Sequence, residues 1–148
     1  MSLDTEVRAL LEVPMFREIE PSRLKLLAFA SERLVFKPEQ VLFNRGDFSD
    51  CAYVILEGSA NVVLDGPEGS FTVATLERHA IVGEMGILTN SPRSATVVAA
   101  TELSVLKIGK DVFFELANEF PGFAVGMMRD LAGRLDRTNA LLASLQAK

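Results

Sequence analysis

The sequence predicts a mainly β fold, an eight-stranded antiparallel β-roll of the jelly-roll type with N-terminal helices and a long C-terminal helix. Between residues 32 and 109, short apolar or alternating runs follow one another without a long helical pattern, which favours an antiparallel roll over a parallel sheet. The flanking segments, residues 1–31 and 110–148, repeat their apolar residues at helical spacing instead. Because no repeat or low-complexity linker interrupts the chain, we expect residues 1–148 to form a single domain.

Two short amphipathic helices are predicted at the N-terminus. The first ends before Pro14, and the second runs from Pro21, a residue suited to the first helical position, to about Ser31. Their apolar stripes consist of Val7, Leu10 and Leu11 in the first helix and of Leu24, Leu27 and Ala28 in the second. We expect both helices to serve packing.

Short strands fill the middle of the chain, and roughly eight are expected between residues 32 and 109. The recognisable runs cover residues 34–36, 41–43, 53–56, 60–64, 71–76, 95–99 and 103–108. Asn44–Asp47 predicts a tight turn between two of them, and Asp65–Gly69 predicts a hairpin.

The C-terminal segment is predicted to be helical. A short helix near residues 112–117 is interrupted by Pro121, and a long helix then runs from about Phe123 to Leu145. One stripe of this helix has the 3-4-3-4-3 spacing of a coiled-coil seam and consists of Met128, Leu131, Leu135, Thr138, Leu142 and Leu145. This spacing predicts a homodimer through the long helix. The alternative is that the same stripe packs on the roll.

Composition argues against several classes of function. The net charge of −5 argues against a sequence-independent grip on nucleic acid, and no apolar run approaches the roughly 18 residues of a membrane span. The single cysteine, Cys51, cannot form an internal disulfide, so we expect a cytoplasmic protein. The single histidine, His79, leaves too few ligands for a metal-dependent enzyme on a similar barrel. We therefore expect no enzyme, no catalytic residue, no metal and no catalytic cofactor.

Residues 81–97 contain two opposite charges, Glu84 and Arg93, in mostly apolar or small surroundings. An arginine fork can hold two phosphate oxygens, and a carboxylate is the natural acceptor for the free 2′-hydroxyl of a ribose. Gly83 permits close backbone approach, and residues 84–88 have the length of one helical turn. The pattern favours a site for a cyclic nucleotide. A plain Glu84–Arg93 salt bridge that braces a loop is the alternative.

The motifs Gly83-Glu84-Met85-Gly86 and Pro92-Arg93-Ser94-Ala95-Thr96 resemble the phosphate-binding cassette of the cyclic-nucleotide-binding domain family. This family includes the bacterial catabolite activator protein and the regulatory subunits of cAMP-dependent protein kinase. The resemblance covers nearly the whole chain, and Asn44–Asp47 and Tyr53–Gly58 lie where the family places its glycine turns.

The resemblance implies a role for each cassette residue. Arg93 would bind the exocyclic phosphate oxygens and Glu84 the ribose 2′-hydroxyl, while Gly83 and the backbone amides near Met85 and Ser94 would complete the cradle. Serine at position 94 leans towards cAMP, although cGMP is possible.

The resemblance extends to the long helix. Aligned from Pro121, Thr138 and Asn139 coincide with a polar pair that reaches the adenine in the catabolite activator protein, and Arg134 coincides with a basic position near its site. Thr138 could alternatively be a polar seam residue that fixes the register of a coiled coil. Whether this lid comes from the same chain or from a dimer mate stays open.

These features predict a non-catalytic cAMP sensor that signals through movement of its C-terminal helices to a protein partner. The alternatives are an interaction or dimerisation module that keeps the fold without a ligand, and the sensor half of a larger regulator. Only residues 146–148 follow Leu145, so we expect a stand-alone domain without a helix-turn-helix, with no direct DNA binding and no membrane association.

Overall fold

The computed structural model of the chain describes residues 3–17 and 19–146. Its N-terminal part contains helix α1 (Leu3–Leu11), the short 3₁₀ helix η1 (Pro14–Phe16) and helix α2 (Pro21–Ala30). The two predicted helices are confirmed, while η1 has no counterpart in the sequence prediction. Pro14 is the first residue of η1, where its missing N–H costs no helical hydrogen bond.

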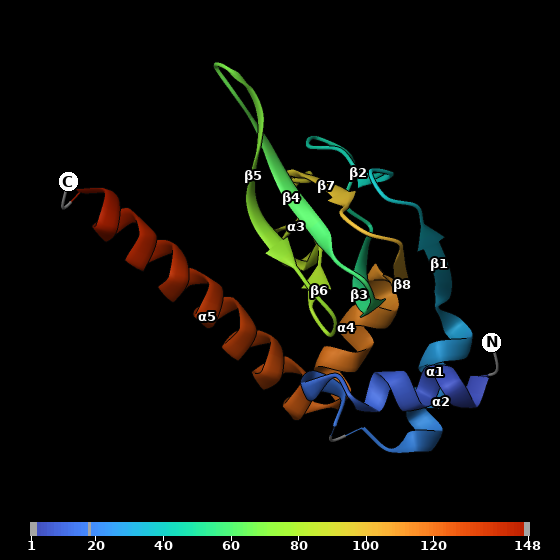
Figure 1. The fold of residues 1–148 in the computed structure, drawn as a ribbon. Coiled ribbons are helices and arrows are strands. Elements are labelled where there is room, and N and C mark those ends of the chain that lie inside the picture. The colour runs from blue at the N-terminus through green and yellow to red at the C-terminus, as the bar shows by residue number, and fades with distance from the viewer. Residues whose placement is uncertain (1–2, 18, 147–148) are drawn as a thin grey trace.

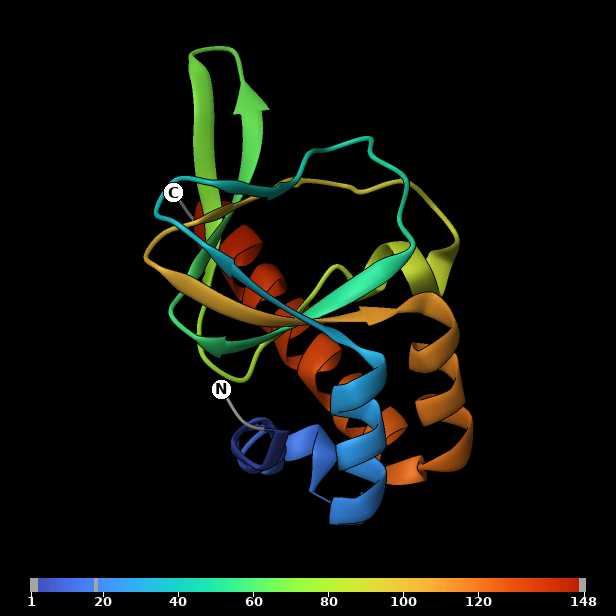
Figure 2. The same cartoon turned by 90° about the vertical axis from the view of Figure 1, so that its right-hand side faces the viewer.

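Eight strands form two four-stranded antiparallel sheets, in the orders β1-β8-β3-β6 and β2-β7-β4-β5. The strands are β1 (Glu32–Phe36), β2 (Val41–Phe43), β3 (Cys51–Glu57), β4 (Ala60–Gly66), β5 (Gly69–Leu76), β6 (Ile81–Val82), β7 (Thr96–Ala99) and β8 (Leu103–Gly109). The predicted fold class is therefore confirmed. In Figures 1 and 2 the β4–β5 hairpin projects from one end of the roll, and the helices α1, α2 and α4 gather at the other.

Strand β3 separates two apolar clusters, which explains its continuous apolar sequence. Its residues Ala52, Val54 and Leu56 face the cluster that the helices cover. Its alternate residues, including Tyr53 and Ile55, face the cluster inside the roll. Because successive side chains of a strand point to opposite faces, a strand buried on both faces has no polar positions to alternate with.

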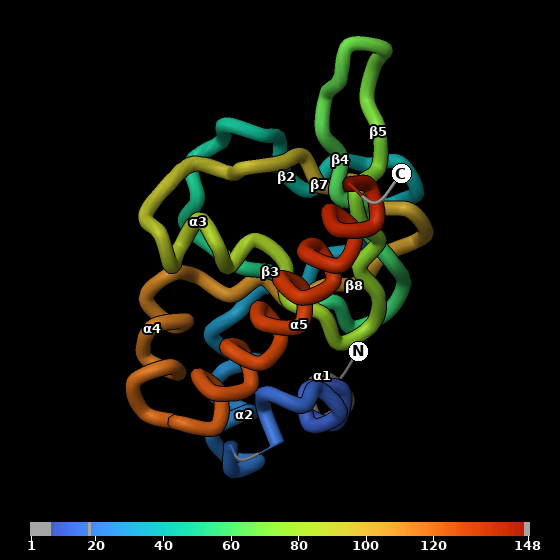
Figure 3. Tube along the Cα trace, turned by 90° about the vertical axis from the view of Figure 1, so that its left-hand side faces the viewer, coloured from blue at the N-terminus to red at the C-terminus, as the bar shows by residue number. Residues whose placement is uncertain are grey.

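The C-terminal part comprises α4 (Lys110–Glu119) and α5 (Pro121–Gln146). Aromatic contacts anchor the start of α5: the ring of Phe123 lies 5.5 Å from that of Phe16 and 5.7 Å from that of Phe113. From Leu135 to Gln146 every residue is exposed. Figure 1 shows this half of α5 diverging from the rest of the chain, and Figure 3 shows it in front of the roll.

Candidate functional site

The cassette begins where the short strand β6 ends. The pairing of Tyr53 with Val82 brings Gly83 beside the start of β3. Gly83 precedes helix α3 (Glu84–Thr89) with a φ of 86°, in the left-handed region that glycine adopts readily. A Cβ atom at this position would collide with Nη1 of Arg93. Both the backbone conformation and the close approach therefore require glycine here, and the predicted helical turn is confirmed.

The turn Asn44–Asp47 positions the backbone of Arg93. Within the turn, the amide of Asn44 donates to the Asp47 carboxylate at 2.9 Å. The Arg93 amide donates to the carbonyl of Asp47 at 2.9 Å, and the Gly46 amide donates to the carbonyl of Arg93 at 2.8 Å. The predicted tight turn thus has a specific role, because it holds the backbone of Arg93 in the loop that leads into β7 (Thr96–Ala99).

The guanidinium group of Arg93 is buried, with 5% of the residue exposed. Its Nη1 donates to the carbonyl of Gly83 at 2.8 Å. Its Nη2 donates to the carbonyl of Cys51 at 2.8 Å and lies 3.4 Å from the Cys51 sulfur. The ring of Phe43 lies under the guanidinium, 4.1 Å from its central carbon. Among the described residues, Nε has no acceptor.

Glu84 is buried as well, with 1% exposed, but it has a cationic partner. Nη1 of Arg134, from α5, lies 3.0 Å from its carboxylate, and Nη2 of Arg134 donates to the carbonyl of Ile81 at 2.6 Å. Asp130, one turn earlier on α5, pairs with Arg134 at 2.9 Å. Burial raises the pKa of the Glu84 carboxyl, and the charge of Arg134 opposes that rise.

The alternative of a Glu84–Arg93 salt bridge is wrong. Glu84 pairs with Arg134, and Arg93 donates to backbone carbonyls instead of to a carboxylate. A buried cation without an anionic partner is unfavourable unless something else compensates its charge. Neutral carbonyls, one aromatic face and the nearby charge of Glu84 surround the Arg93 guanidinium, and none of them is a direct anionic partner. The arrangement therefore suits an additional anion near Nε.

A cavity of about 120 Å³ lies between the two charged groups. Its walls are formed by Phe43, Val62, Leu76, Val82, Gly83, Glu84, Met85, Gly86, Arg93, Ser94, Ala95, Val97 and Arg134. The structure thus brings together five residues that the sequence singles out: Gly83, Glu84, Met85, Arg93 and Ser94. The apolar walls come from the two sheets, from Met85 of α3 and from the loop before β7.

Thr138 and Asn139 do not line this cavity. The Thr138 hydroxyl donates to the carbonyl of Arg134 in its own helix at 2.9 Å, and both residues are exposed. Their contact with a base stays a prediction. The α5 residue that reaches the cavity is Arg134, one helical turn earlier. The family resemblance implies a position for Arg134 near the site, but its bond to Glu84 depends on how α5 packs.

Neither a metal-binding cluster nor a membrane-spanning helix is found among the described residues. Residues 3–17 and 19–146 contain no group of three or more His, Cys, Asp or Glu side chains arranged to hold a metal ion. Within the same residues, no helix has both the length and the apolar character needed to cross a bilayer.

Comparisons with known proteins agree with this geometry. The profile of the family described as cyclic nucleotide-binding domain matches residues 33–120. The cAMP-dependent protein kinase regulatory subunit of Yarrowia lipolytica is 36% identical over 105 residues, which are 71% of this chain and 28% of that protein. Lysophospholipase nte1 of Aspergillus oryzae is 33% identical over 116 residues, which are 78% of this chain and 8% of that protein.

The chain thus spans a small part of the length of these curated relatives. A solved structure of a cyclic nucleotide-binding-like protein from Brucella abortus is similar with a TM-score of 0.64 at 35% identity, over 78% of this chain and 99% of that chain. The family match over residues 33–120 agrees with the two-sheet roll and with the cassette. The chain belongs to the cyclic nucleotide-binding domain family.

Proposed function

We propose that the protein is a non-catalytic, cytoplasmic cAMP sensor, with residues 1–148 forming one cyclic nucleotide-binding domain. The observation that carries this proposal is the state of Arg93. It is a buried guanidinium with no carboxylate partner, it has an unpaired Nε, and it lines the same cavity as the buried Glu84. A cyclic phosphate would supply the missing anion, and the ribose 2′-hydroxyl would donate to Glu84.

Signal transmission would run through Arg134. The cavity of about 120 Å³ is smaller than the roughly 300–1,000 Å³ of typical small-molecule pockets, and Arg134 forms part of its wall. A nucleotide that enters would displace part of this wall, and we propose that Arg134 is the part that moves relative to Glu84. Because Arg134 is an α5 residue, this exchange would change the position of α5. The ligand shifts the helix only as far as it binds the two positions with different affinity.

Two observations favour cAMP among the cyclic nucleotides. Ser94 lines the cavity, and the Yarrowia lipolytica relative is described as cAMP-dependent. The larger relatives suggest that such a domain regulates attached or partner proteins, and we extend this to the present chain as a proposal.

Isothermal titration of the wild-type chain with cAMP, cGMP and 5′-AMP tests the proposal. We expect saturable binding of cAMP, weaker binding of cGMP, and the weakest binding for 5′-AMP, whose phosphate is not tied into a ring. Ligand that binds the folded state alone also raises the midpoint of thermal unfolding. If millimolar cAMP and cGMP produce neither heat nor a shift in that midpoint, the proposal fails.

The projecting half of α5 supports homodimerisation as part of the same proposal. Four of the predicted seam residues are exposed by 53–60%: Met128, Leu135, Leu142 and Leu145. Leu131 differs, since it packs against the core of its own chain. Isolated helices of this length are marginal in water, so a partner helix would stabilise residues 135–146. We propose a parallel pairing of two α5 helices along the exposed seam.

We expect Leu142→Glu to convert the dimer to a monomer, because two like charges would face each other in an apolar seam. Sedimentation velocity over a range of concentrations measures this change. Ala140→Glu adds the same charge to another face of the same helix and should leave the dimer intact. A wild-type chain that stays monomeric throughout the range, or equal effects of the two variants, would contradict the pairing.

A further inference from the structure

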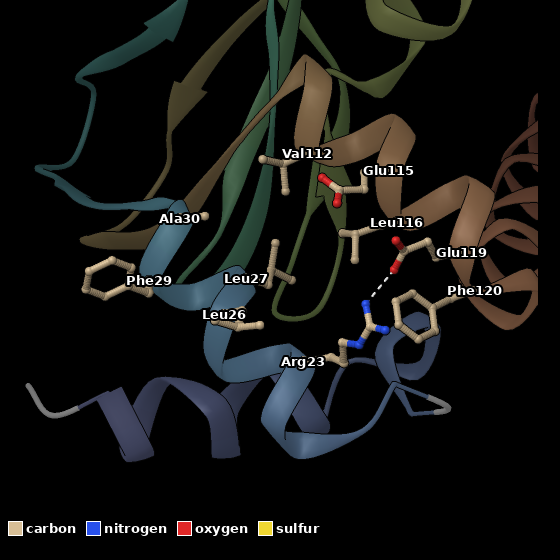
Figure 4. A pocket seen from close by; sticks show the side chains of 10 residues that line it. All are labelled: Arg23, Leu26, Leu27, Phe29, Ala30, Val112, Glu115, Leu116, Glu119 and Phe120. Carbon is tan, nitrogen blue, oxygen red and sulfur yellow. Dashed lines mark hydrogen bonds and ion pairs between the residues drawn. The ribbon is translucent and has the colours of Figure 1, made fainter.

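The molecule has a second concave surface, a groove of about 310 Å³ between α2 and α4, away from the cassette. We call it the α2–α4 groove. Its lining consists of Arg23, Leu26, Leu27, Phe29, Ala30, Val112, Glu115, Leu116, Glu119 and Phe120. Figure 4 shows the two helices facing each other across it, with Leu27 and Leu116 at its base. Those two residues are buried in the core, so the base of the groove is rigid.

The apolar edge of the groove is unusually exposed. Leu26 is 66% exposed and Phe29 is 81% exposed. They lie three residues apart on α2, so they share a face of a helix that buries Leu24, Leu27 and Ala28 elsewhere. A helix whose side chains are apolar around most of its circumference is normally buried by other parts of a protein around most of that circumference. The outer face of α2 is therefore suited to contact another apolar surface.

The charges on the α4 side identify the partner's chemistry. Glu115 and Glu119 lie one helical turn apart and both line the groove. Arg23 neutralises Glu119 at 2.7 Å, and its guanidinium also lies 5.7 Å from the ring of Phe120. Within the described part of the chain, Glu115 has no such ion pair. One surplus carboxylate beside an apolar base favours a partner that combines apolar side chains with a cation.

The backbone surroundings restrict the partner further. The groove is lined by helices, whose backbone groups bond within the helices, so it offers no free strand edge to an extended peptide. A helical partner satisfies its own backbone and needs only side-chain contacts. We propose that the α2–α4 groove binds a basic amphipathic helix of a partner protein, with its apolar side chains against Leu26, Phe29 and Leu116 and a Lys or Arg at Glu115.

The α2–α4 groove adjoins the start of α5, so a movement of α5 can change its shape. Phe120, which lines it, directly precedes the first residue of α5, and Phe113 on α4 packs edge-to-face on Phe123 of α5. A shift of α5 would therefore alter the width of the groove and the affinity for the helix. This link between the groove and the nucleotide rests on the proposed function, whereas binding of the helix does not.

Two synthetic helices with the same leucine stripe, one carrying lysines and one carrying glutamates on the polar face, are suitable probes. Backbone amide shifts locate their binding, and fluorescence anisotropy measures it, first without nucleotide. We expect the leucine–lysine helix to shift the amides of α2 and α4, and Phe29→Ser to weaken it by about fivefold or more, as truncation of a binding hot spot does. Phe29 is exposed, so this variant keeps the fold.

Reversing the charge at Glu115 tests the proposed ion pair directly. Glu115→Lys should weaken the leucine–lysine helix and strengthen the leucine–glutamate helix. The matched control is Glu68→Lys, on the distant β4–β5 turn, which changes the net charge equally. Equal effects of both variants would reduce the binding to non-specific attraction and overturn the proposal. Amide shifts that leave α2 and α4 unchanged, or a self-association that Phe29→Ser removes, would overturn it as well.

Repeating the titration with saturating cAMP tests the link to α5. A change in affinity for the leucine–lysine helix supports it. An unchanged affinity, in a protein that does bind cAMP, overturns the link and leaves the groove intact. A protein that binds the helix but no cyclic nucleotide would instead contradict the proposed function alone.

Discussion

Arg93→Ala is expected to weaken cyclic nucleotide binding by on the order of a hundredfold or more. Hydrogen bonds to charged groups contribute about 1.5–3 kcal/mol each, and about 1.4 kcal/mol corresponds to a factor of ten, so the loss of a two-pronged contact is large. Isothermal titration of the variant with cAMP measures the change. Arg93→Lys should bind with intermediate affinity, because lysine keeps the charge and loses the planar fork.

Two controls separate this effect from a loss of structure. Arg45→Ala removes an exposed arginine from the neighbouring turn and should leave the affinity unchanged. Thermal unfolding of Arg93→Ala without ligand should show a cooperative transition, lowered by the loss of donors to the carbonyls of Gly83 and Cys51. An Arg93→Ala variant that binds cAMP as tightly as Arg45→Ala does would show that the phosphate lies elsewhere.

Within the cassette, the local sequence predicted the backbone turn at Gly83, whereas the roles of Glu84 and Arg93 came from the resemblance to the family. Gly83 adopts a positive φ and meets Arg93, so both the turn and the approach are encoded by the residue type. The turn Asn44–Asp47 closes on its own side chain, and its glycine and acidic residue are visible in the sequence. By contrast, β6 is two residues long, which is too short for an alternating pattern to identify.

Long-range packing explains what the sequence did not predict. The bond between Arg134 and Glu84 joins residues 50 positions apart, and it exists because the aromatic contacts of Phe123 set the direction of α5. The same packing turns Leu131 into the core of its own chain. A heptad pattern identifies an apolar stripe, but it does not say which surface covers each position of that stripe.

The second large effect concerns Glu84, where binding and stability are expected to change in opposite directions. Glu84→Gln keeps the shape of the side chain and removes its charge. We expect cAMP affinity to fall by about tenfold or more, since an amide accepts the 2′-hydroxyl less strongly than a carboxylate does. We expect the free energy of unfolding at neutral pH to rise, because burial makes the ionised form of Glu84 unfavourable in the folded chain.

The pH dependence gives this prediction a definite sign. Burial raises the folded-state pKa of Glu84 above its ordinary value of 4.5, so the folded chain binds this proton more tightly than the unfolded chain does. The wild-type chain is therefore penalised progressively as pH rises from 4.5 through the folded-state pKa, and the penalty is absent below 4.5. Urea unfolding of both proteins should give a stability difference that is small in acid and grows towards neutrality.

Arg134→Gln tests the cause of that difference. It removes the cation that opposes the rise in pKa and leaves Glu84 buried. Without Arg134, the ionised Glu84 carboxylate should be more unfavourable in the folded chain at neutral pH. Arg134→Gln should therefore be less stable than the wild type at neutral pH, and this loss of stability should become smaller in acid. The double variant Glu84→Gln/Arg134→Gln should recover most of the loss, because position 84 then carries no buried charge, while Asp130 loses its pair with Arg134 in both variants alike. If Arg134→Gln is as stable as the wild type both in acid and at neutral pH, the Arg134–Glu84 pair does not hold α5 on the cassette. The proposed route from nucleotide to helix must then run through other residues.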